Sequence, residues 1–172
     1  MRIYHRRQVR QTLNSFAPFR DPALEIQFPQ TVASNERNKS ILAAGVQNGV
    51  WVLRQGARNP NVMEIILTDQ GNRWFSVVEK RIIATFKVGS REATAVTALS
   101  EIFPSRQIRF QYHWNQFHPA AVILGDRLPE AGREYAGEAV LFYENDHWRL
   151  MDWKTPEFDS AVEQFKQLET AQ

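Results

Sequence analysis

The stretch QIRFQYHW, residues 107–114, decides the fold, because apolar and polar residues alternate along its whole length. Ile108, Phe110, Tyr112 and Trp114 are the apolar members. Successive side chains of a β-strand point to opposite faces, so this stretch predicts a strand with one apolar and one polar face. Such a strand belongs in an antiparallel sheet that is covered on one side only.

Further strands are expected on either side of this one. The sequence predicts strands at 81–88, 94–103 and 106–117, and a hairpin made of 138–143 and 147–153 around the turn Glu144-Asn145-Asp146. The expected fold class is therefore α+β, with an antiparallel sheet of at least four strands that includes 106–117, 138–143 and 147–153.

The first part of the chain predicts a mixture of helices and short strands. A short amphipathic helix is expected over 6–16 and an edge strand over 24–28. Ser34 can cap a helix that runs to about Asn48 with Ile41, Leu42 and Val46 inward, and Gly49 supplies a left-handed stop. The runs 50–53 and 62–67 flank a turn and predict a hairpin, and Thr68 is the expected cap of a helix of two to three turns. Residues 119–137 resemble a long irregular connection.

The chain ends in a strong helix signal. Thr155 offers a capping hydroxyl, Pro156 suits the first helical position and Glu157 suits the positive end of the helix. Phe158, Val162, Phe165 and Leu168 then form an apolar stripe over 156–170, which we expect to dock on the sheet.

Composition restricts the class of protein. The chain has 172 residues, 43% of them hydrophobic, which is enough for one domain 1–172, or for two sublobes over 1–80 and 81–172. It has no cysteine, which excludes disulfides and thiolate chemistry. We find no transmembrane run and no signal peptide. The expected location is cytoplasmic if the chain is complete, and envelope-associated if it was trimmed from a longer precursor.

Three short motifs carry a resemblance. They are Leu67-Thr68-Asp69-Gln70-Gly71, the set Gly89, Arg91 and Glu92, and the pair Trp148 and Arg149. The first is similar to the start of the helix that follows the wing in winged-helix domains. Together the three resemble an uncharacterised group of bacterial, often envelope-associated proteins, in which a winged-helix-like half precedes an antiparallel β half. The resemblance implies an architecture over about 30–150 and no activity.

A winged-helix reading would make 34–48 a recognition helix and 55–61 a wing. The basic residues that could then reach DNA are Arg37, Lys39, Arg54 and Arg58. An N-terminal arm with Arg2, Arg6, Arg7 and Arg10 predicts weak, salt-sensitive contact with nucleic acid or an anionic surface. Glu36 lies among the helix cations, and a proline-rich segment replaces the usual preceding helix. These departures favour a protein-binding winged helix over a DNA reader.

The sequence shows no catalytic signature. The four histidines lack the spacing of a zinc site, and His113 and His118 fall on opposite sides of their strand. No phosphate loop or nucleophile motif is present. We therefore expect no catalytic residues, no metal and no cofactor.

The second half also resembles cone-shaped α+β folds that enclose a small-molecule pocket. Five aromatic residues could line such a pocket or an interface, namely Tyr112, Trp114, Phe142, Trp148 and Trp153. Aromatic residues on one face of a strand are more often plain core residues, which is the other interpretation of this set. The expected function is a non-catalytic module that binds a protein partner. A winged-helix DNA-binding regulator and a small-molecule-binding or enzymatic pocket are the alternatives.

Overall fold

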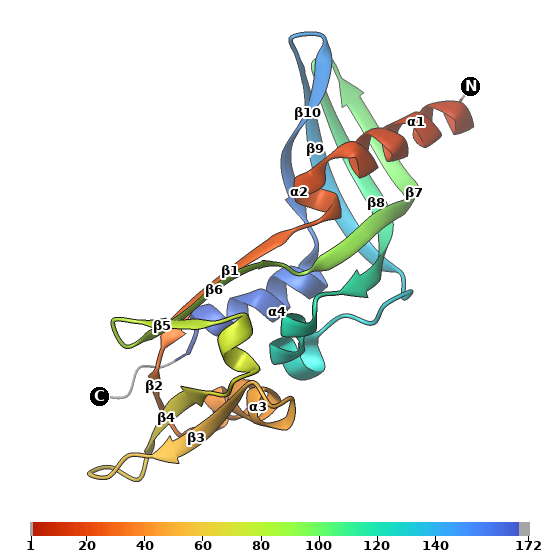
Figure 1. Cartoon of the computed structure of the whole chain (residues 1–172). Coiled ribbons are helices and arrows are strands. Elements are labelled where there is room, and N and C mark those ends of the chain that lie inside the picture. The colour runs from red at the N-terminus through yellow and green to blue at the C-terminus, as the bar shows by residue number, and fades with distance from the viewer. Residues whose placement is uncertain (1, 169–172) are drawn as a thin grey trace. The chain divides into compact units, whose positions relative to one another are not determined.

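The computed structural model describes residues 2–168 of the chain, and of residues 2–4 the backbone alone (Figure 1). The chain forms two compact units whose segments interleave along the sequence. The first unit holds residues 1–22, 89–117 and 129–159, and the second holds 23–88, 118–128 and 160–172. The expected boundary near residue 80 does not coincide with this division, because the helix at the chain start packs on the strands of the second half.

The first unit is built on an antiparallel sheet of four strands in the order β10-β9-β8-β7, which confirms the predicted α+β class. Its elements are α1 (Arg2–Ser15), α2 (Ala17–Arg20), β7 (Gly89–Ile102), β8 (Ser105–Phe117), β9 (Tyr135–Glu144) and β10 (His147–Lys154). Asn145 and Asp146 have φ angles of 52° and 62° in the β9–β10 turn. This geometry matches a two-residue turn whose twist suits a hairpin.

The alternation in β8 separates core from solvent as expected. Ile108, Phe110, Tyr112 and Trp114 are at most 2% exposed, and α1 and α2 cover their side of the sheet (Figure 1). Val9 and Leu13 of α1 are fully buried. These apolar side chains are the main contribution to the stability of the unit, since burying each is worth roughly 1.5–3 kcal/mol.

Side chains of α1 also bond to the backbone of β7, an edge strand of the sheet. The Asn14 side chain donates to the Ala93 carbonyl at 3.0 Å and accepts from the Ala93 amide at 2.7 Å. The Arg10 guanidinium donates to the Thr94 carbonyl at 2.8 Å. Because these contacts satisfy backbone groups that a neighbouring strand would otherwise use, they close this part of the edge.

Arg91 of β7 lies in the core of this unit at 1% exposure. The rings of Phe19, Tyr112, Trp114 and Phe158 surround its guanidinium, with ring centroids 4.8–5.7 Å from Cζ. Its Nε donates to the Phe19 carbonyl at 2.6 Å, and an Nη donates to the Thr155 hydroxyl at 3.1 Å. Burial lowers the pKa of Arg91 to about 10, which leaves the side chain charged at neutral pH. We call this arrangement the Arg91 box.

The same burial raises the pKa of Tyr112 from 10.0 to about 12. A group whose pKa is higher in the folded than in the unfolded protein contributes stability that is present below the unfolded pKa and is lost above it. Tyr112 is therefore expected to lower the free energy of unfolding by about 2–3 kcal/mol as pH rises from 10 towards 12. The lowered pKa of Arg91 has the opposite effect over this range, because the folded protein loses that proton before the unfolded protein does. Denaturant titrations should therefore show the free energy of unfolding of wild type falling relative to that of Tyr112→Phe. The same pH dependence in both proteins would contradict the assignment.

The second unit contains two small sheets with the strand orders β1-β6-β5 and β2-β4-β3. Its strands are β1 (Ala23–Pro29), β2 (Thr31–Ala33), β3 (Trp51–Gln55), β4 (Val62–Leu67), β5 (Ser76–Val78) and β6 (Arg81–Lys87). Its helical elements are α3 (Glu36–Gln47), η1 (Gly71–Arg73) and η2 (Pro119–Arg127). The hairpin β3–β4 is antiparallel, as predicted from its turn.

Trp51 fixes α3 to the neighbouring strand β3. Its side chain is fully buried, and its indole nitrogen donates to the Leu42 carbonyl at 3.1 Å. The ring lies so close to Gly45 that a Cβ there would be 1.8 Å from the nearest ring atom. Only glycine at this position therefore allows the Trp51 ring to lie this close to the helix backbone.

Gly49 follows α3 with a φ of 67°, which is the left-handed stop that the sequence predicted.

The motif Leu67-Thr68-Asp69-Gln70-Gly71 has a local structural role. The Thr68 hydroxyl donates to the Gly49 carbonyl at 2.5 Å and accepts from the Gly71 amide at 3.0 Å. A Cβ on Gly71 would lie 2.0 Å from the Val50 carbonyl oxygen. The Thr68 hydroxyl accepts from the following turn as expected, but Gln70 is the N-cap residue of η1. The predicted helix of two to three turns is wrong, because a single 3-10 turn is followed by β5. The β-branched run Val77-Val78 favours that strand.

Three other local predictions need correction. Asn35, and not Ser34, is the N-cap of α3, with its side chain accepting from the Asn38 amide at 2.9 Å. Val46 was expected to point inward and is 44% exposed. The connection 119–137 is partly ordered, because η2 occupies its first half with Ala120, Ala121, Ile123 and Leu124 buried.

The last helix, α4 (Pro156–Lys166), begins in the first unit and ends in the second. Asp159 in its first turn bonds back to Thr155: its carboxylate accepts from the Thr155 amide at 2.8 Å and from the Thr155 hydroxyl at 3.3 Å. The Phe158 ring centroid lies 5.2 Å from that of Trp114 in the first unit, and Phe165 lies 5.9 Å from Phe28 in the second. Phe158, Phe165 and Leu168 are at most 8% exposed, which confirms the buried stripe, whereas Val162 is half-buried. The end of the predicted range 156–170 lies outside the described residues.

We expect Phe165→Ala to lower the free energy of unfolding by about 3 kcal/mol, because a buried ring is replaced by a cavity. Urea denaturation followed by tryptophan fluorescence measures the change. Glu163→Ala, on the exposed side of the same helix, is the control and should stay within about 0.5 kcal/mol of wild type. An unchanged denaturation midpoint for Phe165→Ala would show that the helix is not docked through this ring.

Candidate functional site

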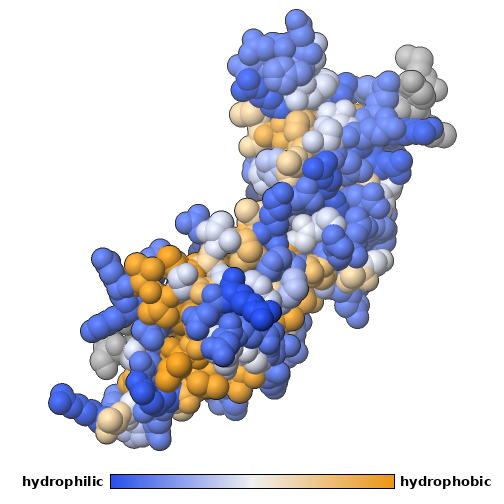
Figure 2. All heavy atoms as spheres, in the orientation of Figure 1, coloured by the Kyte–Doolittle hydropathy of each residue, from blue (hydrophilic) through white to orange (hydrophobic). Residues whose placement is uncertain are grey.

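An apolar groove lies between α3 and the β3–β4 hairpin in the second unit. The groove has a volume of about 490 Å³. Its apolar lining comes from Leu42, Ala43 and Val46 of α3, Leu53 of β3 and Met63 of β4. We call it the α3 groove. Figure 2 shows that apolar side chains reach the surface of this unit in several places.

The rim of the α3 groove is polar and electrically balanced. Glu36 and Lys39 line one side and form an ion pair of 3.4 Å with each other, and Gln47 lies further along the helix. Val46 is one of the lining residues and is 44% exposed. An apolar floor inside a polar rim is typical of surfaces that bind protein segments.

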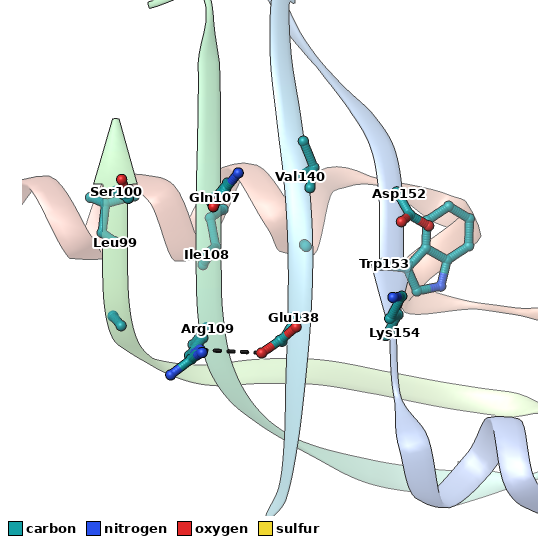
Figure 3. Close-up of a pocket in the computed structure, with 12 residues that line it drawn as sticks. Leu99, Ser100, Gln107, Ile108, Arg109, Glu138, Val140, Asp152, Trp153 and Lys154 are labelled. Atoms are coloured by element: carbon teal, nitrogen blue, oxygen red, sulfur yellow. Dashed lines mark hydrogen bonds and ion pairs between the residues drawn. The ribbon is translucent and has the colours of Figure 1, made fainter. Parts of the chain in front are cut away.

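A second, polar hollow lies on the outer face of the four-stranded sheet in the first unit (Figure 3). It has a volume of about 470 Å³ and is lined from all four strands. Its polar lining consists of Ser100, Gln107, Arg109, Glu138, Asp152 and Lys154, and Trp153 borders it on β10. We call it the sheet hollow. Sequence analysis did not single out these polar residues, although Gln107 and Arg109 belong to the polar face of the decisive stretch.

The side chains of the sheet hollow stand in two registered rows. Cross-strand pairing aligns Ser100, Gln107, Val140 and Asp152 in one row, and Ala98, Arg109, Glu138 and Lys154 in the other. The Arg109 guanidinium lies 3.1 Å from the Glu138 carboxylate, and both side chains are more than half exposed. An ion pair this exposed contributes little to stability.

Two of the four basic residues that the winged-helix interpretation assigned to DNA form ion pairs with acidic neighbours. Arg54 donates to Glu64 across the β3–β4 hairpin at 3.0 Å, and Lys39 pairs with Glu36. Arg37 lies in the first turn of α3, and Arg58 lies in the hairpin loop. These four residues belong to the second unit.

The N-terminal arm belongs to the other unit. Arg6 and Arg7 are exposed on α1, and Arg10 bonds to the backbone of β7. The side chain of Arg2 lies outside the described residues. The arm therefore presents Arg6 and Arg7 to solvent, while Arg10 has a structural contact.

The five aromatic residues expected to line a pocket separate into different environments. Tyr112 and Trp114 are fully buried core residues, and Trp153 borders the sheet hollow. Phe142 is 37% exposed. The Trp148 ring lies under the Arg106 guanidinium, with 3.8 Å between Cζ and the ring centroid.

Trp148 is part of an aromatic ladder at the end of the sheet. Its ring centroid lies 5.2 Å from that of Tyr143, which lies 5.8 Å from that of Phe103. Phe103 is 76% exposed and the adjacent Ile102 is 79% exposed. The turn between β7 and β8 thus carries the most exposed large apolar side chains among the described residues.

The histidines make separate local contacts. His113 lies between Glu92 at 3.1 Å and Glu134 at 3.6 Å, and His5 contacts Glu101 at 2.8 Å. The His118 ring accepts from the Ala120 amide at the start of η2. Within the described part of the chain, no group of three or more acidic or histidine side chains has the arrangement of a metal site.

No family model matches the chain, and neither a curated protein nor a solved structure shows significant similarity to it. None of the described helices is both long and apolar enough to cross a membrane. The geometry of the two hollows therefore provides the basis for a functional assignment.

Proposed function

We propose that this protein is a non-catalytic module that binds an apolar segment of a protein partner in the α3 groove. The observation that supports this most directly is the apolar lining of that groove, with Val46 exposed inside a balanced polar rim. Burial of an apolar side chain gains roughly 25 cal/mol per Å² of surface removed from water, so such a lining favours association.

The secondary structure around the groove suits a helical or extended segment. A helix and a hairpin form its two walls, and amphipathic helices commonly bind in grooves of this kind through apolar residues spaced three or four apart. Ala43 is small, which leaves room between Leu42 and Val46 for an incoming side chain. The partner is therefore expected to present apolar anchors with helical spacing.

DNA binding through the same surface receives less support. Sequence-specific binding uses several Lys or Arg side chains against phosphates and base edges. Here Glu64 and Glu36 lie against Arg54 and Lys39, and the lining between them is apolar. Packing Leu53 and Met63 against a charged phosphate backbone would contribute no favourable binding free energy.

Peptide selection followed by mapping tests the proposal. Random peptides displayed on phage would be selected on the full chain, and the best binder would be titrated while methyl NMR signals are recorded. We expect enrichment of apolar residues at helical spacing and shifts of the Leu42, Val46 and Leu53 methyl groups. Selection of peptides that shift only signals of the first unit would contradict the proposal. So would nanomolar, sequence-dependent binding of duplex DNA at ~0.15 M salt.

A further inference from the structure

We propose that the sheet hollow is a binding site for a neutral, polyhydroxylated ligand, of which an oligosaccharide is the representative class. The site lies wholly in the first unit, whereas the α3 groove lies in the second, so this inference is independent of the proposed function. It rests on the shape, the charge balance and the hydrogen-bonding groups of the hollow (Figure 3).

Small side chains create the space. Ser100 and Val140 alternate with longer residues in one row, and Ala98 ends the other row. Each row crosses four strands, and neighbouring strands lie about 4.8 Å apart, so a row extends for roughly 14 Å. A hollow of this length on a hydrogen-bonded sheet holds its polar groups at fixed separations, which lowers the entropic cost of binding.

The charges of the hollow balance. Arg109 and Lys154 contribute positive charge, and Glu138 and Asp152 contribute negative charge. An anion would meet both carboxylates and a cation would meet both basic groups. The charge distribution therefore selects a ligand without net charge.

Donors and acceptors lie side by side across the rows. Arg109 and Lys154 donate, Glu138 and Asp152 accept, and Gln107 does both. A hydroxyl group is also both donor and acceptor, so a ligand with several hydroxyls can satisfy neighbouring partners of either kind. Because the Arg109–Glu138 pair is exposed, it can exchange part of its bonding for ligand hydroxyls at small cost.

Titration with neutral oligosaccharides tests this site on the full chain. Maltohexaose, cellohexaose and hexa-N-acetylchitohexaose would be added separately, with backbone amide shifts recorded by NMR. We expect at least one to shift the amides of Gln107, Arg109 and Glu138 with a saturable, micromolar-to-millimolar affinity. Absence of saturable shifts up to about 10 mM for all three would overturn the proposal. A stronger response to a charged heparin hexasaccharide would also overturn it.

Two variants on one strand provide the matched control. Gln107 and Gln111 are both exposed on the polar side of β8, and only Gln107 lines the hollow. Gln107→Ala should weaken oligosaccharide binding about 5- to 10-fold through a lost hydrogen bond, and Gln111→Ala should leave it unchanged. Equal weakening by both variants, or by neither, would contradict the assignment of the site.

Discussion

Arg91→Ala is expected to lower the free energy of unfolding by about 3–5 kcal/mol, a large fraction of the stability of an ordinary domain. The substitution empties the Arg91 box, so the rings of Phe19, Tyr112, Trp114 and Phe158 lose their shared partner. It also leaves the Phe19 carbonyl without its donor at 2.6 Å. Urea denaturation at neutral pH measures the loss.

The variant Arg91→Met separates the contribution of side-chain packing to stability from the contribution of the buried charge. Methionine keeps an unbranched stem among the rings and removes the buried positive charge, whose desolvation disfavours folding. We expect this variant to lose less than about half as much as Arg91→Ala, because buried ionic groups are often replaceable by apolar groups of similar size. A cost for Arg91→Ala below about 1 kcal/mol would contradict the structural role of the box.

Gly45→Ala is expected to lower the free energy of unfolding of the second unit by at least about 3 kcal/mol. Helix propensity alone would predict the opposite, a gain in stability. In an exposed helix interior, alanine is about 1 kcal/mol more favourable than glycine. Here the added Cβ would lie 1.8 Å from the Trp51 ring, which is fully buried and cannot move without displacing α3. Thermal unfolding followed by the fluorescence of the tryptophans reports the effect.

Ser40→Ala is the control for Gly45→Ala. Ser40 is exposed on the same helix, so its replacement should follow propensity and leave stability equal or slightly higher. If Gly45→Ala were as stable as wild type, the contact between Trp51 and the α3 backbone would be wrong.

The local sequence pattern predicted the strands and hairpins well. The alternation in 107–114 places side chains on the two faces of a strand in any surroundings. Asn145 and Asp146 are residue types that tolerate the positive φ angles of the two-residue turn. The wrong helix after Thr68 is explained by contacts between distant residues. The helix expected after Thr68 is one turn long, because Gly71 lies against Val50 and the chain then pairs with β6.

The candidate sites were less accessible to sequence analysis. The buried position of Arg91 depends on four aromatic rings from three separate segments, and an arginine in a strand is ordinarily exposed. The rows of the sheet hollow exist only through the register of four strands. The groove lining could be anticipated in part from Leu42 and Val46, but the exposure of Val46 required the position of the β3–β4 hairpin.

The most direct measurement of the central claim compares two valines of equal exposure. Val46 lies in the α3 groove and Val77 lies outside it on β5, and each is 44% exposed. Each aspartate costs stability, by opposing the helix dipole at Val46 and through low strand propensity at Val77, so thermal unfolding is used to check that both variants are folded at the assay temperature. For a peptide selected on the wild-type chain, Val46→Asp is expected to weaken binding at least about 10-fold, and Val77→Asp is expected to leave it unchanged. Unchanged affinity in Val46→Asp, or equal loss in both variants, would contradict protein binding through the α3 groove.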